Sequence, residues 1–500
     1  MKNKILLLYV NVLVDANIPL GPSMISSTLK QKYEVRLFDT TFYLNESIKI
    51  EEKRVEWLEH KKLTEELPSL NTTNVYEDFE KLYNEFKPDL IAVSVTSIDY
   101  KLALNLIKNV NVPVLFGGVH STVAPEDLIT HPKVTHVFRG EAEDAILELV
   151  DKILSKQSLK GFKGVWYKEN GEIIKNESIL FVKDLSTLPM PDWGIFDERH
   201  FYRPFEGKIY RMGNYALSRG CPYFCSYCIN HIYQRYDEGG YRTVPLDKAF
   251  EEIKQLAKEH NVQIMKFWDD NFLGSQSNSK KFLERYPQEI GLPFTMQTRP
   301  ETLTEEFAQL LKKANCIAIS MSIESGNERI RRNILNRHVK NEDIIKGFQL
   351  CKKYGLRTTT GILIGLPEET KKEFFETIEL VKKCQPTSIN TSLLQPFKGT
   401  KIREWCVKHK WLEEKDDCVG NIIFSYQLKN PHFTKKELLN FKKLFSIYAH
   451  TDSKYHSIIE KAGEDELFYS FLKEVYAKII HPSSQIIKCN KTNTNHLDIP

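Results

Sequence analysis

Three cysteines lie within eight residues of one another near the middle of the chain. Cys221, Cys225 and Cys228 have the spacing C-x3-C-x2-C. A cubane iron–sulfur cluster is normally held by four thiolates. Three local thiolates, with no fourth cysteine nearby, leave one iron of such a cluster open, so that a cofactor or substrate can bind the metal directly. The spacing therefore predicts a 4Fe-4S cluster with one free coordination site, and any fold of this chain has to present the three thiolates on one loop.

Two other uses of cysteine fit the sequence less well. A structural zinc site usually pairs a C-x2-C with a second pair of Cys or His, and the chain has no second C-x2-C. Nine cysteines in 500 residues are sparse and odd in number, which argues against a disulfide scaffold. The remaining cysteines are scattered and are expected to be small buried or surface thiols: Cys316, Cys351, Cys384, Cys406, Cys418 and Cys489.

The composition limits the classes of protein to which the chain can belong. Its 500 residues suggest about three domains, and the net charge of +4 gives no reason to expect a nucleic-acid partner. No apolar stretch approaches the ~20 residues needed to span a bilayer. The apolar start of the chain is short and lacks the small-residue cleavage site of a signal peptide. Free thiols and an oxygen-sensitive cluster fit a reducing compartment, so we expect a cytoplasmic protein.

Residues 1–155 alternate apolar runs with helical patterns. We expect strands at 5–10, 34–38, 90–95, 112–116 and 134–138, and helices that include 24–31, 101–108 and 143–154. Runs rich in Val, Ile and Leu between helices are typical of a parallel sheet with both faces covered. In such a sheet, ligands bind beyond the carboxyl ends of the strands.

Glycines and polar residues gather at the predicted carboxyl ends of these strands. Glycine lets the backbone approach a large ligand closely, and hydroxyl groups supply hydrogen bonds. No G-x-G-x-x-G follows the first strand, so a nicotinamide cofactor is disfavoured. The residues at these strand ends are Ser94, Thr96, Gly117, Gly118, His120, Gly140 and Glu141.

Two further segments belong to the first part of the chain. Residues 44–88 form a charged insertion that we expect to make surface helices flanking the sheet. Residues 156–205 are expected to form a linker, which starts with a hairpin around Asn170-Gly171, a strong two-residue turn signal. Pro189 and Pro191 then interrupt regular structure.

A second series of strands and helices occupies residues 206–400. Strands are expected at 216–218, 264–268, 294–297, 318–323, 359–364 and 388–394. In β/α barrels the chemistry takes place at the carboxyl ends of the strands, and several of these strands end in a polar residue or glycine. Residues 401–500 look helical, and Thr434 followed by Glu437 forms a capping box. We expect this C-terminal region to close the open side of the barrel.

The cysteine motif resembles the signature of the radical S-adenosylmethionine (SAM) superfamily. That signature has the same spacing with an aromatic residue just before the last cysteine, and Tyr227 holds this place. The strand ends of residues 1–155 resemble the cobalamin-binding domain that precedes many radical SAM barrels. Many cobalamin proteins have a D-x-H-x-x-G motif whose histidine binds cobalt, and residues 1–155 lack it. We expect His120 to hydrogen-bond the backbone of its turn, so the lower face of cobalt stays unassigned.

The resemblance implies an α/β chain with three main parts. These are an N-terminal Rossmann-like (flavodoxin-like) cobalamin-binding domain, a central partial (β/α)6 radical SAM barrel and a C-terminal helical region. The implied cofactors are a 4Fe-4S cluster on the three cysteines, SAM on the open iron, and cobalamin against the seven strand-end residues named above. The residues expected to hold SAM are Asp269, Asp270, Arg299, Glu324, Ser325, Gly361 and Gly365.

The resemblance also implies what each of these positions does. Asp269 or Asp270 would pair with the ammonium group of SAM, since a carboxylate beside an ammonium is a favourable charge pair. Arg299 would meet the carboxylate of SAM. The turn that starts at Glu324 would lie near the ribose, and the strand that holds the two glycines would pack against adenine.

The reaction follows from the same resemblance. One electron from the cluster would cleave SAM, and the resulting radical would remove hydrogen from an unactivated carbon, which then takes a methyl group from cobalamin. We expect a methyltransferase acting on a small metabolite or peptide, with an external electron donor of the flavodoxin or ferredoxin type. The alternatives are a cobalamin-dependent radical SAM cyclase or oxidoreductase without methyl transfer, and a non-catalytic Fe-S/cobalamin sensor. A methylthiotransferase is disfavoured, because those enzymes carry a second cluster in the N-terminal domain and residues 1–220 contain no cysteine.

Overall fold

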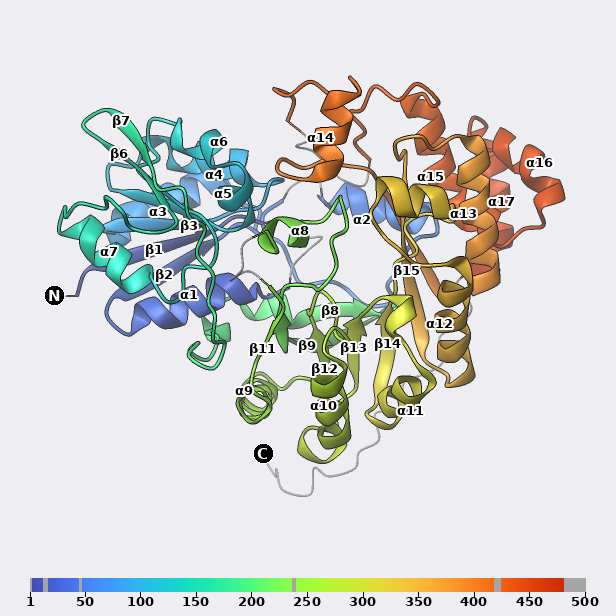
Figure 1. Cartoon of the computed structure of the whole chain (residues 1–500), viewed down its shortest axis with the longest axis horizontal. Coiled ribbons are helices and arrows are strands. Elements are labelled where there is room, and N and C mark those ends of the chain that lie inside the picture. Colours follow the sequence, from blue (N-terminus) through green and yellow to red (C-terminus); the bar gives the residue numbers. More distant parts are fainter. Residues whose placement is uncertain (1, 12–16, 45–46, 236–239, 418–423, 481–500) are drawn as a thin grey trace.

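The computed structural model describes residues 2–11, 17–44, 47–235, 240–417 and 424–480. They form two seven-stranded sheets, the helices that cover them, and a C-terminal group of helices (Figure 1). Cys418 and Cys489 lie outside the described residues. Within the described ranges, no helix combines the length and the apolar character needed to cross a membrane.

The first sheet has the strand order β2-β1-β3-β4-β5-β6-β7. Its first five strands are parallel in the order 2-1-3-4-5, which is the flavodoxin-like order, so the predicted fold class is confirmed here. The hairpin that the sequence places in the linker extends this sheet, because β6 pairs antiparallel with β5. The strands are β1 Lys4–Tyr9, β2 Glu34–Asp39, β3 Leu90–Ser94, β4 Val114–Gly117, β5 His136–Phe138, β6 Val165–Glu169 and β7 Glu172–Lys175.

Helices cover both faces of the first sheet. Ile5 and Leu7 of β1 pack on one face with α1 and α7, whereas Leu6 and Leu8 pack on the other face with α3 and α4. Successive side chains of a strand point to opposite faces, which explains why the apolar run of β1 is continuous. These helices are α1 Leu20–Lys30, α3 Val75–Phe86, α4 Tyr100–Leu106 and α7 Ile146–Leu154.

The second sheet has the strand order β16-β15-β14-β13-β12-β9-β8. Strands β9 to β16 of this sheet are parallel, and β8 pairs antiparallel with β9 at one edge. A helix follows most of the parallel strands, so this part is the predicted partial (β/α)6 barrel. The strands are β8 Tyr202–Phe205, β9 Lys208–Tyr215, β12 Ile264–Phe267, β13 Phe294–Gln297, β14 Cys316–Ser320, β15 Arg357–Ile364 and β16 Ser388–Leu393, and the helices are α9 Leu246–Glu259, α10 Gln276–Glu289, α11 Glu305–Lys313, α12 Asn341–Lys353 and α13 Lys371–Cys384.

The first strand of the barrel lies earlier in the chain than the sequence predicts. The prediction was 216–218, whereas β9 ends at Tyr215 and the next residues form the short strand β10, Ser218–Arg219, which pairs with β11, Arg242–Thr243. Polar residues and Gly213 interrupt the apolar pattern of β9 and hide the strand. Gly213 is suited to this position because a Cβ atom there would lie only 3.1 Å from Leu256 of α9.

The C-terminal helices pack against the end of the barrel. Helix α15 begins with the predicted capping box, in which Thr434 Oγ accepts from Glu437 N and the Glu437 carboxylate accepts from Thr434 N. Helix α15 lies beside α13 and β16. The helices of this region are α14 Lys401–Lys408, α15 Lys435–Ala449, α16 His456–Lys461 and α17 Glu466–Ile480.

The charged insertion at 44–88 is divided between the two sheets. Helix α3 covers the first sheet, as expected for a flanking helix. Helix α2, Ser47–Glu56, lies instead beside the barrel and the C-terminal helices (Figure 1). The carbonyl of Glu56 accepts a hydrogen bond from Tyr469 of α17. The expectation that the whole insertion flanks the first sheet is therefore wrong for its first half.

The residues after α2 connect the two edges of the partial barrel. Glu59 binds Lys442 of α15 at 2.6 Å and accepts a hydrogen bond from Thr391 of the edge strand β16. Thr64 and Glu65 bind backbone groups at the turn between β8 and β9. The barrel is thus closed by an N-terminal segment as well as by the C-terminal helices, because the segment reaches both of its edges.

Candidate functional site

The cysteine loop is anchored by the end of the second barrel strand. Asp269 follows β12 and is buried. Its carboxylate accepts hydrogen bonds from Leu217 N at 3.1 Å and from the Ser218 hydroxyl. Burial raises the pKa of Asp269 to about 6, although these hydrogen bonds oppose the shift. Both donors lie just before Cys221, so Asp269 holds the start of the loop, whereas its neighbour Asp270 lines a cavity.

The three predicted cluster ligands are free thiols on this loop. Cys225 is buried, and Ser226 N donates to Leu335 O at 2.9 Å, which fixes the middle of the loop. Burial raises the pKa of Cys221 to about 11 and that of Cys228 to about 12. The thiols of Cys221 and Cys228 are therefore protonated near neutral pH, and iron has to displace their protons on binding.

The donor set fits a cluster better than a single ion. Among the described residues, no group of three or more Cys, His, Asp or Glu side chains is arranged to hold one metal ion. A cubane binds each cysteine through a different iron, so its ligands stand farther apart than those of one ion. Three thiols on one loop, with no fourth cysteine nearby in the sequence, match that requirement.

Arg299 lies beside the cysteines, after β13. Its Nη1 is 3.5 Å from Cys225 Sγ, and its guanidinium carbon is 3.7 Å from the centroid of the Tyr223 ring. Its Nε donates to Glu301 at 2.5 Å. A buried cation favours the ionised form of a neighbouring acid, so this guanidinium is placed to stabilise thiolates or a cofactor carboxylate.

The turn after β14 is tied to the cysteine loop. Glu324 has a positive φ of 64°, and its carboxylate accepts a hydrogen bond from Tyr227 Oη at 3.0 Å. Burial raises the pKa of Glu324, although the charge of Arg337 opposes this shift. The backbone carbonyl of Ser325 accepts from Arg331 Nη1 at 2.6 Å. The aromatic residue of the cysteine motif thus positions the predicted ribose turn.

The two glycines predicted near adenine pack closely against the chain. A Cβ atom at Gly361 would lie 2.6 Å from Ser322 Oγ. Gly365 has a φ of 79°, and a Cβ atom there would lie 2.7 Å from the ring of Tyr426. Tyr426 Oη donates to Gly365 O at 2.8 Å. Gly365 is therefore required by the fold itself, independently of any contact with a cofactor, whereas at Gly361 the close atom is the rotatable hydroxyl of Ser322.

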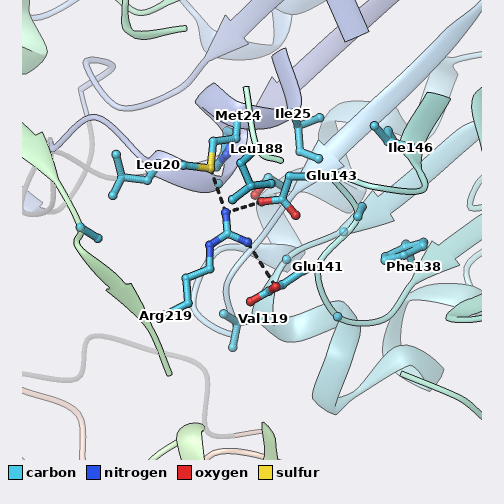
Figure 2. A pocket seen from close by; sticks show the side chains of 18 of the residues that line it. Leu20, Met24, Ile25, Val119, Phe138, Glu141, Glu143, Ile146, Leu188 and Arg219 are labelled. Atoms are coloured by element: carbon cyan, nitrogen blue, oxygen red, sulfur yellow. Dashed lines mark hydrogen bonds and ion pairs between the residues drawn. The ribbon is translucent and has the colours of Figure 1, made fainter. Parts of the chain in front are cut away.

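A cavity of about 380 Å³ lies between the carboxyl edge of the first sheet and the cysteine loop (Figure 2). Its inner wall is apolar and includes Leu7, Leu115, Phe138 and Ile146. Its barrel side includes Asp270 and other residues next to the cysteine loop. The predicted cobalamin residues that line it are Ser94, Gly117, Gly118, Gly140 and Glu141.

The three predicted glycines at the cavity differ in whether the chain leaves room for a Cβ atom. Gly118 and Gly140 have φ values of 96° and 102°, and Cβ atoms there would lie 2.7 Å from Val95 O and 1.9 Å from Leu180 O. The chain itself therefore demands glycine at these two positions. A Cβ atom at Gly117 would meet only Val93 O, at 3.9 Å. Among these three glycines, Gly117 is therefore the one at which the chain leaves room for a Cβ atom.

Two predicted cobalamin residues of the described chain, Thr96 and His120, lie away from this cavity. Thr96 Oγ1 donates to Asp99 at 2.8 Å. His120, in α5, Val119–Val123, is buried with Nδ1 3.0 Å from Ser97 Oγ, and its ring stacks on Tyr100 at 4.1 Å between centroids. Burial lowers the pKa of His120 to about 4. His120 is thus neutral, and its ring contacts the side chains of Ser97, Tyr100 and Asp127 instead of the backbone that we expected it to bind.

Sequence reasoning assigned no role to three charged residues around Glu141: Arg219 and Glu143 line this cavity, and Arg242 binds Glu141 without lining it. Arg219 binds Glu143 at 2.6 Å and Glu141 at 3.2 Å (Figure 2). Arg242 binds Glu141 at 2.8 Å. Arg219 lies two residues before Cys221, a position that could have attracted notice. Arg242 carries no such local signal, because only the pairing of β10 with β11 brings it here.

The cavity suits the predicted cofactor on chemical grounds. Its apolar inner wall and polar mouth fit a large ligand with an apolar portion and hydrogen-bonding edges, as cobalamin has. Its barrel side adjoins the loop of the three thiols. Asp270, predicted to bind SAM, and the five predicted cobalamin residues named above therefore line the same cavity.

Two family models match the chain. The model of the radical SAM superfamily matches residues 215–381, and the model of the B12 binding domain matches residues 58–150. The first range starts at the end of β9 and runs into α13. The second covers β3 to β5 and ends in α7. Together these ranges span about half of the chain.

Similar proteins cover larger shares of the chain. An uncharacterized methyltransferase of Pyrococcus horikoshii is 25% identical over 401 residues, which are 79% of this chain and 79% of that protein. An anaerobic magnesium-protoporphyrin IX monomethyl ester cyclase of Rubrivivax gelatinosus is 26% identical over 62% of this chain, which spans 57% of the cyclase. The structure of the radical SAM methyltransferase TsrM from Kitasatospora setae matches with a TM-score of 0.62 at 15% identity, covering 94% of this chain and 100% of that chain. The fold is thus shared over nearly the whole chain. Because both family models match, this protein is a radical SAM protein with a B12 binding domain.

Proposed function

We propose that this enzyme is a cobalamin-dependent methyltransferase that acts on an unactivated carbon of a small metabolite or peptide. The observation that carries the proposal is the single cavity shared by the edge of the first sheet and the residues beside the cysteine loop. Cobalamin as the methyl donor and the cluster with SAM as the radical source would then lie at the same cavity, as methyl transfer to a carbon radical requires. When bound, the cluster and SAM supply the radical and cobalamin supplies the methyl group.

The chain's own residues bind and orient these groups. Cys221, Cys225 and Cys228 hold the cluster and leave one iron open for SAM. Asp270, at the cavity, is placed to pair with the ammonium group of SAM. Arg299, beside Cys225, is placed to meet the carboxylate of SAM.

Other residues shape the nucleoside and cobalamin sites. Glu324 and Ser325 form the turn proposed to lie near the ribose, and the strand from Gly361 to Gly365 forms the wall proposed for adenine. The apolar inner wall of the cavity excludes water, which protects a reactive radical from side reactions. The electron enters from an external flavodoxin- or ferredoxin-type donor.

A cyclase or oxidoreductase is the second candidate, and the similarity to the cyclase of Rubrivivax gelatinosus favours it. Methyl transfer and cyclisation differ in their products from SAM. A methyltransferase that replaces its methyl group from SAM forms S-adenosylhomocysteine, whereas a cyclase forms none. The test is anaerobic incubation of the loaded, reduced enzyme with SAM, followed by chromatography of both SAM products.

The same assay separates the enzymes from a sensor. A non-catalytic protein makes neither S-adenosylhomocysteine nor 5′-deoxyadenosine under these conditions. Cys225→Ala serves as the control, because it removes a proposed cluster ligand and should abolish both products. Product formation by this variant equal to that of the wild type would overturn the assignment of the cluster.

A further inference from the structure

Arg219, which lines the cavity, and Arg242 come from the two strands of the small sheet β10–β11. Strand β10 ends at Arg219, two residues before Cys221, and the pairing of β10 with β11 places Arg219 directly opposite Arg242. The two guanidinium groups therefore start from adjacent positions. Because Arg219 directly precedes the cysteine loop, any force on its side chain acts on the loop itself.

The carboxylates that meet these arginines come from the first domain. Arg219 Nη2 lies 2.6 Å from Glu143 Oε1, and Nη1 lies 3.2 Å from Glu141 Oε2. Arg219 Nη2 also lies 2.8 Å from the sulfur of Met24 in α1 (Figure 2). One side chain of the barrel thus contacts both a helix and the loop after β5 of the cobalamin-binding domain.

Glu141 is itself held rigidly. Its carboxylate accepts from Val182 N at 2.9 Å and from Arg242 Nη1 at 2.8 Å, and its own backbone N donates to Leu180 O at 2.8 Å. Burial alone would raise the pKa of Glu141, but the hydrogen bond and charge of Arg242 and the charge of Arg219 hold it below its usual value. The carboxylate is therefore an ionised, fixed point to which the arginines attach.

The network contains two cations and two anions, and all four side chains are largely buried. Their exposed fractions are 19% for Arg219, 18% for Glu141, 5% for Glu143 and 12% for Arg242. Arginine binds carboxylates through a planar fork whose donors have fixed directions. Such a group specifies orientation as well as distance, unlike the flexible lysine pairs at the exposed surface.

We propose that Arg219 is a positioning residue that fixes the cysteine loop relative to cobalamin by binding Glu141 and Glu143. This inference rests on the proposed function, because it assumes that both cofactors bind where the cavity and the thiols suggest. Methyl transfer from SAM to cobalt needs the two cofactors in register, whereas reductive cleavage of SAM needs the cluster alone. Loss of Arg219 should therefore uncouple the two reactions.

The test uses the full-length protein loaded with cluster and cobalamin, as wild type, Arg219→Gln and Arg219→Lys. Arg285→Gln is the matched control, because Arg285 also binds two carboxylates, Asp247 and Glu289, but on the outer surface of the barrel. Pulsed electron paramagnetic resonance of the reduced cluster and cob(II)alamin measures the distance between the two centres. With titanium(III) citrate as reductant, chromatography measures S-adenosylhomocysteine and 5′-deoxyadenosine formed from SAM.

We expect one narrow distance in the wild type and in Arg285→Gln, and a broadened distribution in Arg219→Gln. The ratio of S-adenosylhomocysteine to 5′-deoxyadenosine should fall by about tenfold or more in Arg219→Gln, because small displacements of reacting groups are costly. Arg219→Lys, which keeps the charge but not the fork, should give an intermediate result. If Arg219→Gln fails to hold its cofactors, Glu143→Gln carries the test, since it removes one contact and leaves the arginine in place.

An unchanged distance and an unchanged product ratio would overturn the inference. Parallel loss of both products at an unchanged distance would overturn it as well, because it would assign Arg219 a different role. A wild-type protein that forms neither product sinks the proposed function instead, and the distance measurement then still reports on Arg219.

Discussion

The buried ion pair of Glu59 and Lys442 tests how the insertion is fastened to the barrel. The two side chains are 2% and 0% exposed, and Nζ lies 2.6 Å from the carboxylate. Lys442 Nζ also donates to the Thr391 hydroxyl at 2.8 Å. Burial lowers the pKa of Lys442 to about 8, even though the charge of Glu59 opposes this shift. Attraction to Glu59 therefore does not fully offset the cost of removing this ammonium group from water.

The expected free energies follow from this balance. Removing one partner leaves a buried charge without its counterion, which costs about 3–5 kcal/mol. Glu59→Gln should cost an amount at the upper end of this range, because the neutral amide that replaces the carboxylate leaves the ammonium group of Lys442 without its counterion. Lys442→Met belongs at the lower end, because Arg54 Nε remains 3.3 Å from Glu59. The double variant removes both charges and should cost about 1 kcal/mol or less.

Hydrogen exchange of the full-length chain is the suitable assay, because a multidomain protein has no single unfolding free energy. Backbone amides in residues 54–65 and in α15 report the local opening free energy. A loss of about 3 kcal/mol corresponds to an exchange rate raised about a hundredfold. If the double variant shows the sum of the two single effects, the charges do not interact and the reasoning is refuted.

The same pair predicts a pH dependence. The folded-state pKa of Lys442, about 8, lies below its ordinary value of 10.5. The unfolded chain therefore binds more protons between these values, and local stability should rise with pH in that window. After correction for intrinsic exchange, this rise should be absent in Lys442→Met. A rise of equal size in the variant would contradict the assignment.

Five further substitutions test the candidate site and the structure around it. Gly117→Ala should keep the melting temperature of the protein and weaken its cobalamin binding in an absorbance titration, and a normal cobalamin affinity would exclude Gly117 from the site. Gly140→Ala should instead prevent folding, because its Cβ atom would lie 1.9 Å from a backbone oxygen. Asp269→Ala should lower the iron content per chain, because it releases the cysteine loop. Asp270→Ala should keep the iron content and weaken SAM binding, measured by calorimetry. The reverse pattern would assign the loop contact to Asp270 and the SAM contact to Asp269. Burial raises the pKa of Glu369 from 4.5 to about 8, so the folded wild type binds an extra proton in that range. The local opening free energy at Gly365 and Leu366, whose backbone N atoms bind Glu369, should therefore fall with rising pH relative to Glu369→Gln in hydrogen exchange. The same pH dependence in both proteins would disprove this.

Local sequence patterns predict much of the fold because strands and helices depend on neighbouring residues. The apolar run of β1 and the strand at Phe294–Gln297 were found in this way, and the capping box at Thr434 was confirmed. Strand β9 was missed because its buried face is interrupted by polar residues and a glycine that the packing of α9 requires. The hairpin β6–β7 was recognised as a hairpin, but its membership of the first sheet depends on a pairing with β5 that no local pattern encodes.

The insertion shows the same limit more strongly. Its charge pattern predicts surface helices, and α3 is one, but Glu59 is buried against Lys442, which lies 383 residues away in the chain. A run of charged residues does not reveal which of them will find a buried partner. Only the packed chain brings an N-terminal carboxylate to the open side of the barrel.

By itself, the sequence determined the donor set of the proposed cluster, because three cysteines within eight residues remain on one loop in any fold. It also determined the parallel α/β architecture, since continuous apolar strands between helices bury both faces of a sheet. The tertiary structure decided which of two adjacent carboxylates, Asp269 or Asp270, faces the cavity, and which charged groups join the domains. Those choices depend on distances between residues far apart in the chain, and such distances are set by packing and by the pairing of buried charges.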